Sequence, residues 1–233
     1  IMDSDIAYEN VIVYHGSDHI IEHPEFGYGK TYNDYGTGFY CTENPNMAKE
    51  WGVGIDHNGY ANQYKITCDG LSIFDLNASK YTMLHWLTIL LENREFDTST
   101  PLAAESKEYL LTTFHTDYKA ADIIVGYRAD DSYFSFASDF INGAISYRQL
   151  CNAMRLGKLG QQFVLKSEAA FNRLEFIGYE IADAKEWYKK KAFRDQSARR
   201  QYFDTERNHR QRGDLYITTI LDEEMKPDDP RLR

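Results

Sequence analysis

Short apolar runs, several of them with alternating polarity, predict strands along the chain. Val, Ile, Phe and Tyr dominate these runs, and such residues favour extended structure. Successive side chains of a strand point to opposite faces, so Phe39 and Cys41 are expected on one face and Tyr40 on the other. Asp69 and Gly70 lie between two of the runs and predict a hairpin turn. The predicted strands span residues 11–14, 39–41, 61–68, 71–75, 123–125 and 161–165.

Apolar residues three and four positions apart predict helices in other segments. Leu84, Leu87 and Leu91 have this spacing, which places them on one face of a helix as a packing surface. Pro45 suits the first turn of another helix, and Ser146 is a typical N-terminal cap. The predicted helices cover 80–93, 103–118, 134–141 and 146–156, with short helices after residues 45 and 167. Strands and helices together predict a protein of the α/β (α+β) class.

Residues 185–212 differ from the rest of the chain in charge. They hold ten Lys or Arg against four Asp or Glu, a local charge of +6, and no Gly or Pro interrupts them. Aromatic residues, among them Trp187 and Phe193, are interleaved with these charges. We therefore predict a domain over residues 1–180 and a basic helical extension over 181–233, packed on that domain or projecting from it. The extension is either a solvated helix whose aromatic residues pack on an acidic body, or a docking surface for a nucleic acid or an acidic protein.

Composition narrows the class of protein. The 233 residues carry a formal net charge of −10, which argues against general nucleic-acid binding through a basic surface. Cys41, Cys68 and Cys151 are scattered, without the spacing of zinc ligands or of a disulfide framework. No apolar run has the length of a signal peptide or a membrane span. We therefore expect a cytoplasmic protein that binds no metal and no membrane.

Two stretches carry candidate chemistry. Gly36 and Gly38 flank a single Thr, and Tyr40 follows in a predicted strand. Glycines allow the chain to turn sharply and to approach a flat ligand closely. Trp51 comes eleven residues after Tyr40, so the two aromatic rings can converge on one planar ligand; a hairpin turn followed by a helix with a core Trp is the structural alternative. His15 ends the first predicted strand beside a glycine, where its ring can reach a ligand hydroxyl.

In this combination and order, the chain resembles the ADP-ribosyltransferase superfamily, in its His-Tyr branch. It is most similar there to the bacterial DUF3990 family. The resemblance covers about residues 9–180. It is carried by residues 14–17 (Tyr-His-Gly-Ser), 34–42 (Asp-Tyr-Gly-Thr-Gly-Phe-Tyr-Cys-Thr), 48–51 (Ala-Lys-Glu-Trp), 122–126 (Asp-Ile-Ile-Val-Gly) and 161–165 (Gln-Gln-Phe-Val-Leu).

The resemblance implies a fold and a set of NAD contacts. The implied fold is a split mixed β-sheet around an NAD cleft, with peripheral helices. His15 would hydrogen-bond an adenosine-ribose hydroxyl of NAD, and the Gly16 backbone would pair with the nicotinamide carboxamide. Tyr40 would stack on the nicotinamide, with Trp51 as a second stacking ring. Two further residues, Ser17 and Gly38, complete the expected NAD-binding set.

Gln162 occupies the third signature position, where the superfamily often has Glu. Transfer of ADP-ribose breaks the bond between nicotinamide and ribose, and positive charge develops on the sugar. A carboxylate stabilises that charge, whereas a neutral amide holds a ribose hydroxyl but offers no full charge and no general base. The expected catalytic residues are therefore His15, Tyr40 and Gln162, and the departure at Gln162 predicts mono-transfer at most.

The expected activity is NAD-dependent mono-ADP-ribosyl transfer to a macromolecule, protein or nucleic acid, with NAD as substrate. The resemblance also suggests a toxin or effector, with an antitoxin protein as a neutralising partner. Two alternatives stay open. One is NAD hydrolysis with water as the acceptor. The other is a module for NAD binding or protein interaction that has lost catalysis, and Gln162 is the feature that favours it.

Overall fold

The computed structural model describes residues 8–129 and 131–233. The chain divides into two compact units, which we describe separately. The sheet unit comprises residues 1–78, 117–128 and 159–194, and the helical unit comprises residues 79–116, 129–158 and 195–233. Among the described residues, no helix is both long and apolar enough to cross a membrane.

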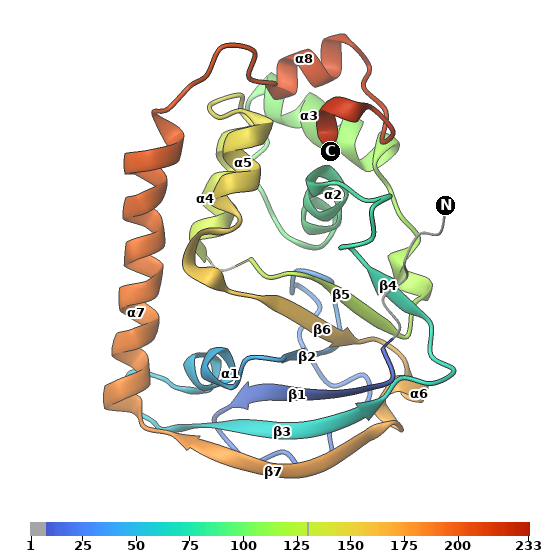
Figure 1. Ribbon diagram of the computed structural model, residues 1–233, viewed down its shortest axis with the longest axis vertical. Helices are drawn as coiled ribbons and strands as arrows, with labels where there is room; N and C mark the ends of the chain where they lie inside the picture. Colours follow the sequence, from blue (N-terminus) through green and yellow to red (C-terminus); the bar gives the residue numbers. More distant parts are fainter. Residues whose placement is uncertain (1–7, 130) are drawn as a thin grey trace. The chain divides into compact units, whose positions relative to one another are not determined.

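The sheet unit contains a seven-stranded mixed sheet with the strand order β4-β5-β6-β2-β1-β3-β7 (Figure 1). Neighbouring strands are antiparallel except for β4 and β5, which are parallel. The predicted mixed α/β class is thus confirmed. The strands are β1 (Asn10–Ser17), β2 (Phe39–Thr42), β3 (Gly59–Thr67), β4 (Ile73–Asp75), β5 (Ile123–Tyr127), β6 (Gln161–Leu165) and β7 (Leu174–Ala182).

The pairing of β1 with β2 is very short. Their register consists of one pair among the described residues, Tyr14 with Thr42. By contrast, β1 pairs with β3 from Asn10 to Ser17, and β2 pairs with β6 along its whole length. The sheet is therefore weakly joined at this point, and backbone groups of β1 and β2 beyond this pair are left outside the ladder.

One face of the sheet forms the core of the unit. Phe39 and Cys41 belong to this core, whereas Tyr40 does not, which confirms the predicted alternation of β2. A buried aliphatic or aromatic side chain of this kind contributes about 1.5–3 kcal/mol to stability. The core residues are Val11, Val13, Phe39, Cys41, Tyr64, Ile66, Cys68, Ile123, Val125, Phe163, Leu165 and Ala170.

Two helices of the sheet unit begin where the sequence supplies a cap. Helix α1 (Pro45–Gly52) has Pro at its start, and the side chain of Asn44 accepts a hydrogen bond from the backbone of Asn46. Helix α6 (Glu168–Phe171), predicted as a short helix after residue 167, is capped by Ser167. A 3₁₀ turn, η1, covers Tyr118–Ala120.

The predicted hairpin around Asp69 and Gly70 is wrong. Strand β4 pairs with β5 at one side of the sheet, and β3 pairs with β1 and β7 at the other. The Asp122 carboxylate accepts hydrogen bonds from the backbone N–H and the hydroxyl of Ser72, at 2.7 and 2.9 Å. These bonds hold the segment before β4 against the start of β5, so the turn leads the chain away from β3.

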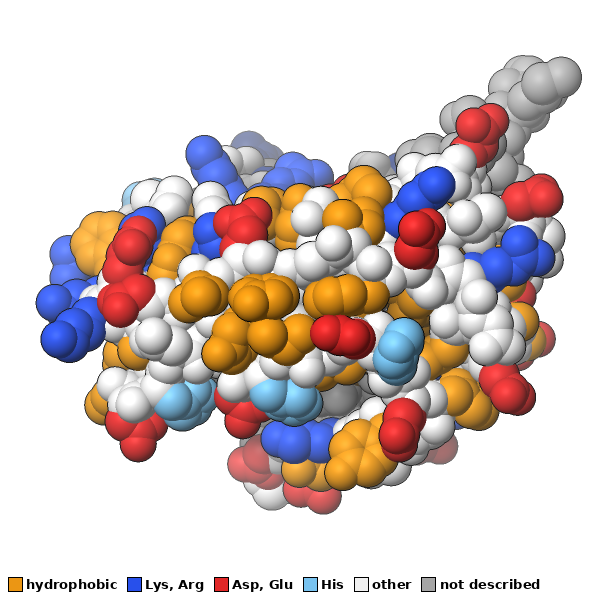
Figure 2. Space-filling model, turned by 90° about the horizontal axis from the view of Figure 1, so that it is seen from below, with side chains coloured by type: hydrophobic (Ala, Val, Ile, Leu, Met, Phe, Trp, Pro, Cys, Tyr) orange, Lys and Arg blue, Asp and Glu red, His pale blue; other side chains and the backbone are white. Residues whose placement is uncertain are grey.

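Strand β7 was not predicted. It is an edge strand, and its register with β3 shifts between Gln63 and Tyr64, which is a β-bulge. The extra residue interrupts the two-residue alternation by which a strand is found. Figure 2 shows a row of hydrophobic side chains over this region, and Ile177, Tyr179 and Ile181 are exposed.

The helical unit is built around α2 (Met83–Asn93), in which Met83 to Leu91 are buried. The predicted helices of this region are confirmed, although α3 ends at Thr113 rather than near residue 118. Ser146 caps α5 as predicted and forms a capping box with Gln149. The remaining elements are α3 (Pro101–Thr113), α4 (Asp131–Ile141), α5 (Tyr147–Ala153), η2 (Leu156–Lys158), α8 (Ile217–Asp222) and η4 (Pro230–Leu232).

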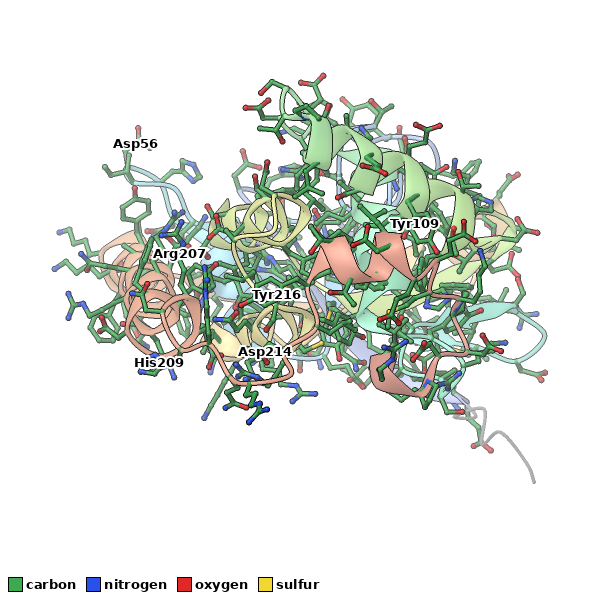
Figure 3. The ribbon with its side chains drawn as sticks, turned by 90° about the horizontal axis from the view of Figure 1, so that it is seen from above. Asp56, Tyr109, Arg207, His209, Asp214 and Tyr216 are labelled. Atoms are coloured by element: carbon green, nitrogen blue, oxygen red, sulfur yellow. The ribbon has the colours of Figure 1, made fainter. Side chains whose placement is uncertain are left out.

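Side chains of this unit hold the segment that follows α7. Arg148 forms an ion pair with Asp214 at 2.8 Å and donates to the backbone carbonyl of His209 at 2.9 Å. Figure 3 labels the two acceptor residues, His209 and Asp214. The hydroxyl of Tyr109 donates to the carbonyl of Met225 at 2.8 Å. These bonds fix the C-terminal segment against α5 and α3.

Helix α7 (Ala184–Gln201) occupies the first part of the predicted basic helix. It passes into a π-helical turn, η3 (Tyr202–Arg207). Trp187 and Tyr202 are buried, whereas Phe193 is exposed. The domain boundary at residue 180 and the docking role of this segment stay predictions.

Candidate functional site

The first site residue, His15, lies on β1 beside the weak junction with β2. Its Nδ1 is 2.7 Å from the backbone carbonyl oxygen of Tyr40, and its ring stacks on Phe39 with centroids 4.2 Å apart. A carbonyl oxygen only accepts, so we assign the proton of the ring to Nδ1. Burial lowers the pKa of His15 to about 4. The ring is therefore neutral at pH 7, and its Nε2 is a hydrogen-bond acceptor.

The hydroxyl of Tyr40 is held by a hydrogen-bond network with the glycine-rich loop. Its hydroxyl donates to the carbonyl of Gly36 at 2.5 Å and accepts from the backbone N–H of Tyr35 at 3.1 Å. The ammonium of Lys166, just after β6, donates to the carbonyls of Tyr35, at 2.7 Å, and of Thr37. The glycine-rich loop is thus tied both to Tyr40 and to the end of β6.

Gly16 allows α1 to lie directly on β1. A Cβ atom at this position would be 2.0 Å from the carbonyl oxygen of Ala48 and 2.8 Å from the Cβ of Trp51. Backbone atoms cannot yield at such distances, so any larger residue would push α1 away. The absence of a side chain therefore sets the close approach of Trp51 to the strand that carries His15.

The two other predicted NAD-binding residues have structural contacts of their own. A Cβ on Gly38 would lie 2.7 Å from Cγ1 of Val164 and 2.9 Å from the carbonyl oxygen of Leu165, so packing against β6 accounts for this glycine. The hydroxyl of Ser17 accepts from the backbone N–H of His19 at 3.2 Å. Contacts of Gly38 and Ser17 with NAD stay predictions.

Gln162 is buried on the same face as Tyr40. It lies opposite Thr42 of β2 and opposite Gly126 of β5, so it is a diagonal neighbour of Tyr40, about 7–8 Å away between backbones. Its exposed fraction is 4%, and its Oε1 has no hydrogen-bond partner among the described residues. The adjacent Gln161 faces the other way and donates to Asn77 at 2.7 Å.

An unfilled acceptor in such a place is unfavourable. Leaving a buried polar atom without a partner costs about 1–3 kcal/mol, and native proteins rarely tolerate it without a reason. A ligand hydroxyl or N–H that reached Gln162 would remove this cost. The geometry therefore marks Gln162 as a candidate ligand contact.

Arg128 is a site residue that the sequence reasoning missed. Its guanidinium lies over the indole ring of Trp51, 3.9 Å from the ring centroid, a distance at which a cation is attracted to the aromatic face. Strands β6 and β2 separate β5, which Arg128 follows, from β1. The contact between Arg128 and Trp51 therefore joins elements that are separated by two strands in the sheet. A basic residue directly after a buried strand was the available signal, but it resembles an ordinary turn residue.

Comparison with known families supplies the next observation. Residues 11–176 match the family described as "Protein of unknown function (DUF3990)". The chain belongs to the DUF3990 family. No curated protein and no solved structure matched the chain.

The DUF3990 match covers the whole candidate site. His15, Tyr40, Trp51, Arg128 and Gln162 all lie within it, and the basic helix α7 lies outside it. No group of His, Cys, Asp or Glu among the described residues is arranged to hold a metal ion. The candidate site contains the aromatic rings of Tyr40 and Trp51, the neutral imidazole of His15, the amide of Gln162 and the guanidinium of Arg128.

Proposed function

We propose that this DUF3990 protein is an NAD-dependent mono-ADP-ribosyltransferase with the fold of that superfamily, and that NAD lies where β1 and β2 separate. The observation that carries the proposal is Gln162, a buried amide whose Oε1 has no partner in the part of the chain that the structure describes, on the face that also presents Tyr40. The Gly16 backbone and the neutral His15 lie on the adjacent strand β1, and the ring of His15 is on the opposite, core face of the sheet, against Phe39. These are the donor, acceptor and stacking groups that a dinucleotide with a flat amide-bearing ring requires.

The proposed binding roles follow from the geometry of each group. Nε2 of His15 accepts a hydrogen bond from an adenosine-ribose hydroxyl, because Nδ1 is already bonded to the carbonyl of Tyr40. The backbone of Gly16, beyond the last registered β1–β2 pair, pairs with the nicotinamide carboxamide. The ring of Tyr40 stacks on the nicotinamide, since its hydroxyl is engaged by the loop at Gly36.

Arg128 modifies the predicted role of Trp51. The nicotinamide ring of NAD carries a positive charge, and the guanidinium already covers one face of the indole. A second planar cation therefore either stacks on the opposite face or displaces Arg128. The first arrangement holds two positive charges close to each other, and the second requires Arg128 to leave the indole, so in either case Arg128 is a determinant of NAD affinity.

In the reaction, the bond between C1′ of the ribose and the nicotinamide nitrogen breaks, and nicotinamide leaves with the bonding electron pair as a neutral ring. The acceptor nucleophile forms the new bond to C1′ and releases its proton to solvent. The carbonyl of Gln162 holds a ribose hydroxyl and orients the sugar. Because the amide lacks a full negative charge, the rate is expected to be about 10²–10³ below that of a site with a carboxylate.

Gln162 also favours a second candidate function, NAD binding without turnover. The same geometry is compatible with NAD hydrolysis when water is the acceptor. A toxin or effector role with a neutralising antitoxin rests on the resemblance of the sequence to the superfamily and stays a prediction.

The test follows nicotinamide release and the fate of the ADP-ribose together. The purified protein is incubated with NAD labelled in its adenylate phosphate and with a cell lysate, and label is measured on protein and on nucleic acid separately. Tyr40→Ala is the site variant, and Tyr188→Ala, at a half-exposed position of α7, is the matched control. Label on either polymer that is lost in Tyr40→Ala and kept in the control supports the transferase.

Other outcomes separate the alternatives. Nicotinamide release without labelled polymer indicates NAD hydrolysis. NAD binding by calorimetry with no release in any lysate indicates a binding module and contradicts the enzyme. Absence of NAD binding in the folded wild-type protein contradicts the proposal as a whole.

A further inference from the structure

The outer edge of the sheet at β7 has the properties of an unfilled pairing site. It is nine residues long and ends the strand order, so one row of its N–H and C=O groups faces outward. Proteins usually protect such an edge with Lys, Pro, short strands or a covering segment. Strand β7 contains neither Lys nor Pro, and its single bulge lies at Ile177, which leaves residues 179–182 regular.

Side chains on the two faces of this edge differ in character. Tyr179 and Ile181 lie on the core face, opposite Asn62 and Tyr60 of β3, and are 48% and 61% exposed. Glu180 lies on the other face, and Glu175 lies on that face beyond the bulge; both are exposed. The edge therefore presents apolar groups on one side and carboxylates on the other.

Each of the two carboxylates has a lysine close to it. Oε2 of Glu180 pairs with the ammonium of Lys49 at 2.5 Å, and Glu175 lies opposite Lys65 of β3. Both glutamates are exposed at the edge, where a further cation can reach them. The protein as a whole carries a formal charge of −10. A strand added beside β7 would place its own side chains next to Glu175 and Glu180 on one face, and next to Tyr179 and Ile181 on the other.

We propose that β7 binds an extended segment of a partner protein by strand addition, and that this segment alternates apolar with basic residues. Backbone hydrogen bonds to the free edge supply affinity, and the two faces of β7 select the partner. The apolar residues of the segment cover Tyr179 and Ile181, and its Lys or Arg residues lie beside the two glutamates. Edge strands that expose contiguous apolar surface are typical protein-interaction sites.

A second copy of this chain fits the edge less well. Two antiparallel copies of β7 would bring the acidic faces of both strands to the same side of the joined sheet, so Glu175 and Glu180 of one copy would lie close to those of the other. Like charges in neighbouring strands destabilise pairing. Charge complementarity therefore favours a basic partner over self-association.

The inference goes beyond the proposed enzymatic function and is tested without NAD. The probe is a fluorescein-labelled nine-residue peptide of alternating Val and Lys. Its binding to the full chain is measured by fluorescence anisotropy. Two control peptides have the same length: one has the same composition with Val and Lys grouped in blocks, and the other alternates Val with Glu. Strand addition predicts at least tenfold tighter binding of the Val–Lys alternation than of either control peptide.

Matched variants locate the contact. Ile181→Lys places a positive charge on the apolar side of the edge, and Ile12→Lys makes the same change at an exposed Ile of β1, an inner strand. Ile181→Lys is expected to weaken binding of the Val–Lys peptide at least tenfold, and Ile12→Lys is expected to change the affinity for this peptide less than twofold. Glu180→Lys is expected to weaken binding of the Val–Lys peptide and to strengthen binding of the Val–Glu peptide.

Three results would overturn the proposal. The first is binding of the block peptide as tightly as the alternating one, which would indicate simple charge attraction. The second is an equal loss of binding in Ile181→Lys and Ile12→Lys. The third is a concentration-dependent dimer, seen by light scattering and abolished by Ile181→Lys, together with no peptide binding; this would assign the edge to a second copy of the chain.

Discussion

Replacing Gln162 with Met separates the stability of the protein from its proposed function. Gln162 is 4% exposed, and its Oε1 has no partner among the described residues. An unsatisfied buried acceptor costs about 1–3 kcal/mol, and Met fills a similar volume without that atom. Allowing for imperfect packing, we expect a gain of about 1 kcal/mol in the free energy of unfolding. For a chain of this size, that gain raises Tm by about 2–4 °C.

Gln161→Met is the matched control, because this neighbouring amide faces the other way and donates to Asn77 at 2.7 Å. Loss of that bond is expected to lower the unfolding free energy by about 0.5–1.5 kcal/mol and to leave NAD affinity unchanged. Stability is measured by thermal and denaturant unfolding, and NAD affinity by calorimetry. A Gln162→Met variant that is less stable than the wild type by more than 1 kcal/mol would refute the reasoning, because Oε1 would then have a partner in the folded protein. A more stable variant that binds NAD normally would refute the role of Gln162 in the site.

Three further perturbations probe the groups around Gln162. Arg128→Ala removes a positive charge near the proposed nicotinamide position and is expected to tighten NAD binding about fivefold, because about 1 kcal/mol of repulsion is relieved. Weaker NAD binding in calorimetry would show that Arg128 attracts the diphosphate instead. Arg128→Lys keeps the charge and is the control. Lys166→Met frees the carbonyls of Tyr35 and Thr37 and is expected to raise the Kd for NAD at least fivefold, with Tm reduced by only a few degrees. The pKa of His15 is lowered to about 4, so between pH 6.5 and 4 the unfolded chain binds the proton more readily than the folded one. The free energy of unfolding therefore falls as the pH drops through that range, by up to about 3 kcal/mol. His15→Gln should flatten this part of the plot of unfolding free energy against pH, and an unchanged plot would contradict the burial of a neutral ring.

Local signals in the sequence predicted most strands and helices correctly, but they did not predict which strands pair with each other. The alternation of Phe39, Tyr40 and Cys41 and the cap at Ser146 depend on residues close in the chain, and the structure confirms them. Strand pairing depends on the whole sheet. Asp69 and Gly70 favour a tight turn in any context, but the bonds from Ser72 to the carboxylate of Asp122 connect segments that the sequence gives no reason to pair.

The same distinction applies to the candidate site, where some residues are found from local spacing and others only from the strand order. His15, Tyr40 and Trp51 were found because they stand in a short motif with fixed spacing, and that spacing needs no knowledge of the sheet. The contact of Arg128 with Trp51 depends on the strand order, because β5 and β1 are brought together through β6 and β2. No spacing along the chain encodes that reach. The burial of Gln162 likewise required the register of β6 between its two neighbours.

The strand junction gives His15 a structural role beside its proposed role in ligand binding. Beyond the pair of Tyr14 with Thr42, β1 and β2 exchange no further registered pairs among the described residues, and the carbonyl of Tyr40 is bonded by the His15 ring. Nδ1 thus acts as a side-chain donor where a strand backbone would otherwise donate, and this use fixes the tautomer that leaves Nε2 as an acceptor. A residue that fills only the first role, such as Gln, would preserve the junction through its own N–H group. The two roles are therefore separable, and loss of NAD affinity in His15→Gln with an intact Tm would assign ligand binding to Nε2 alone.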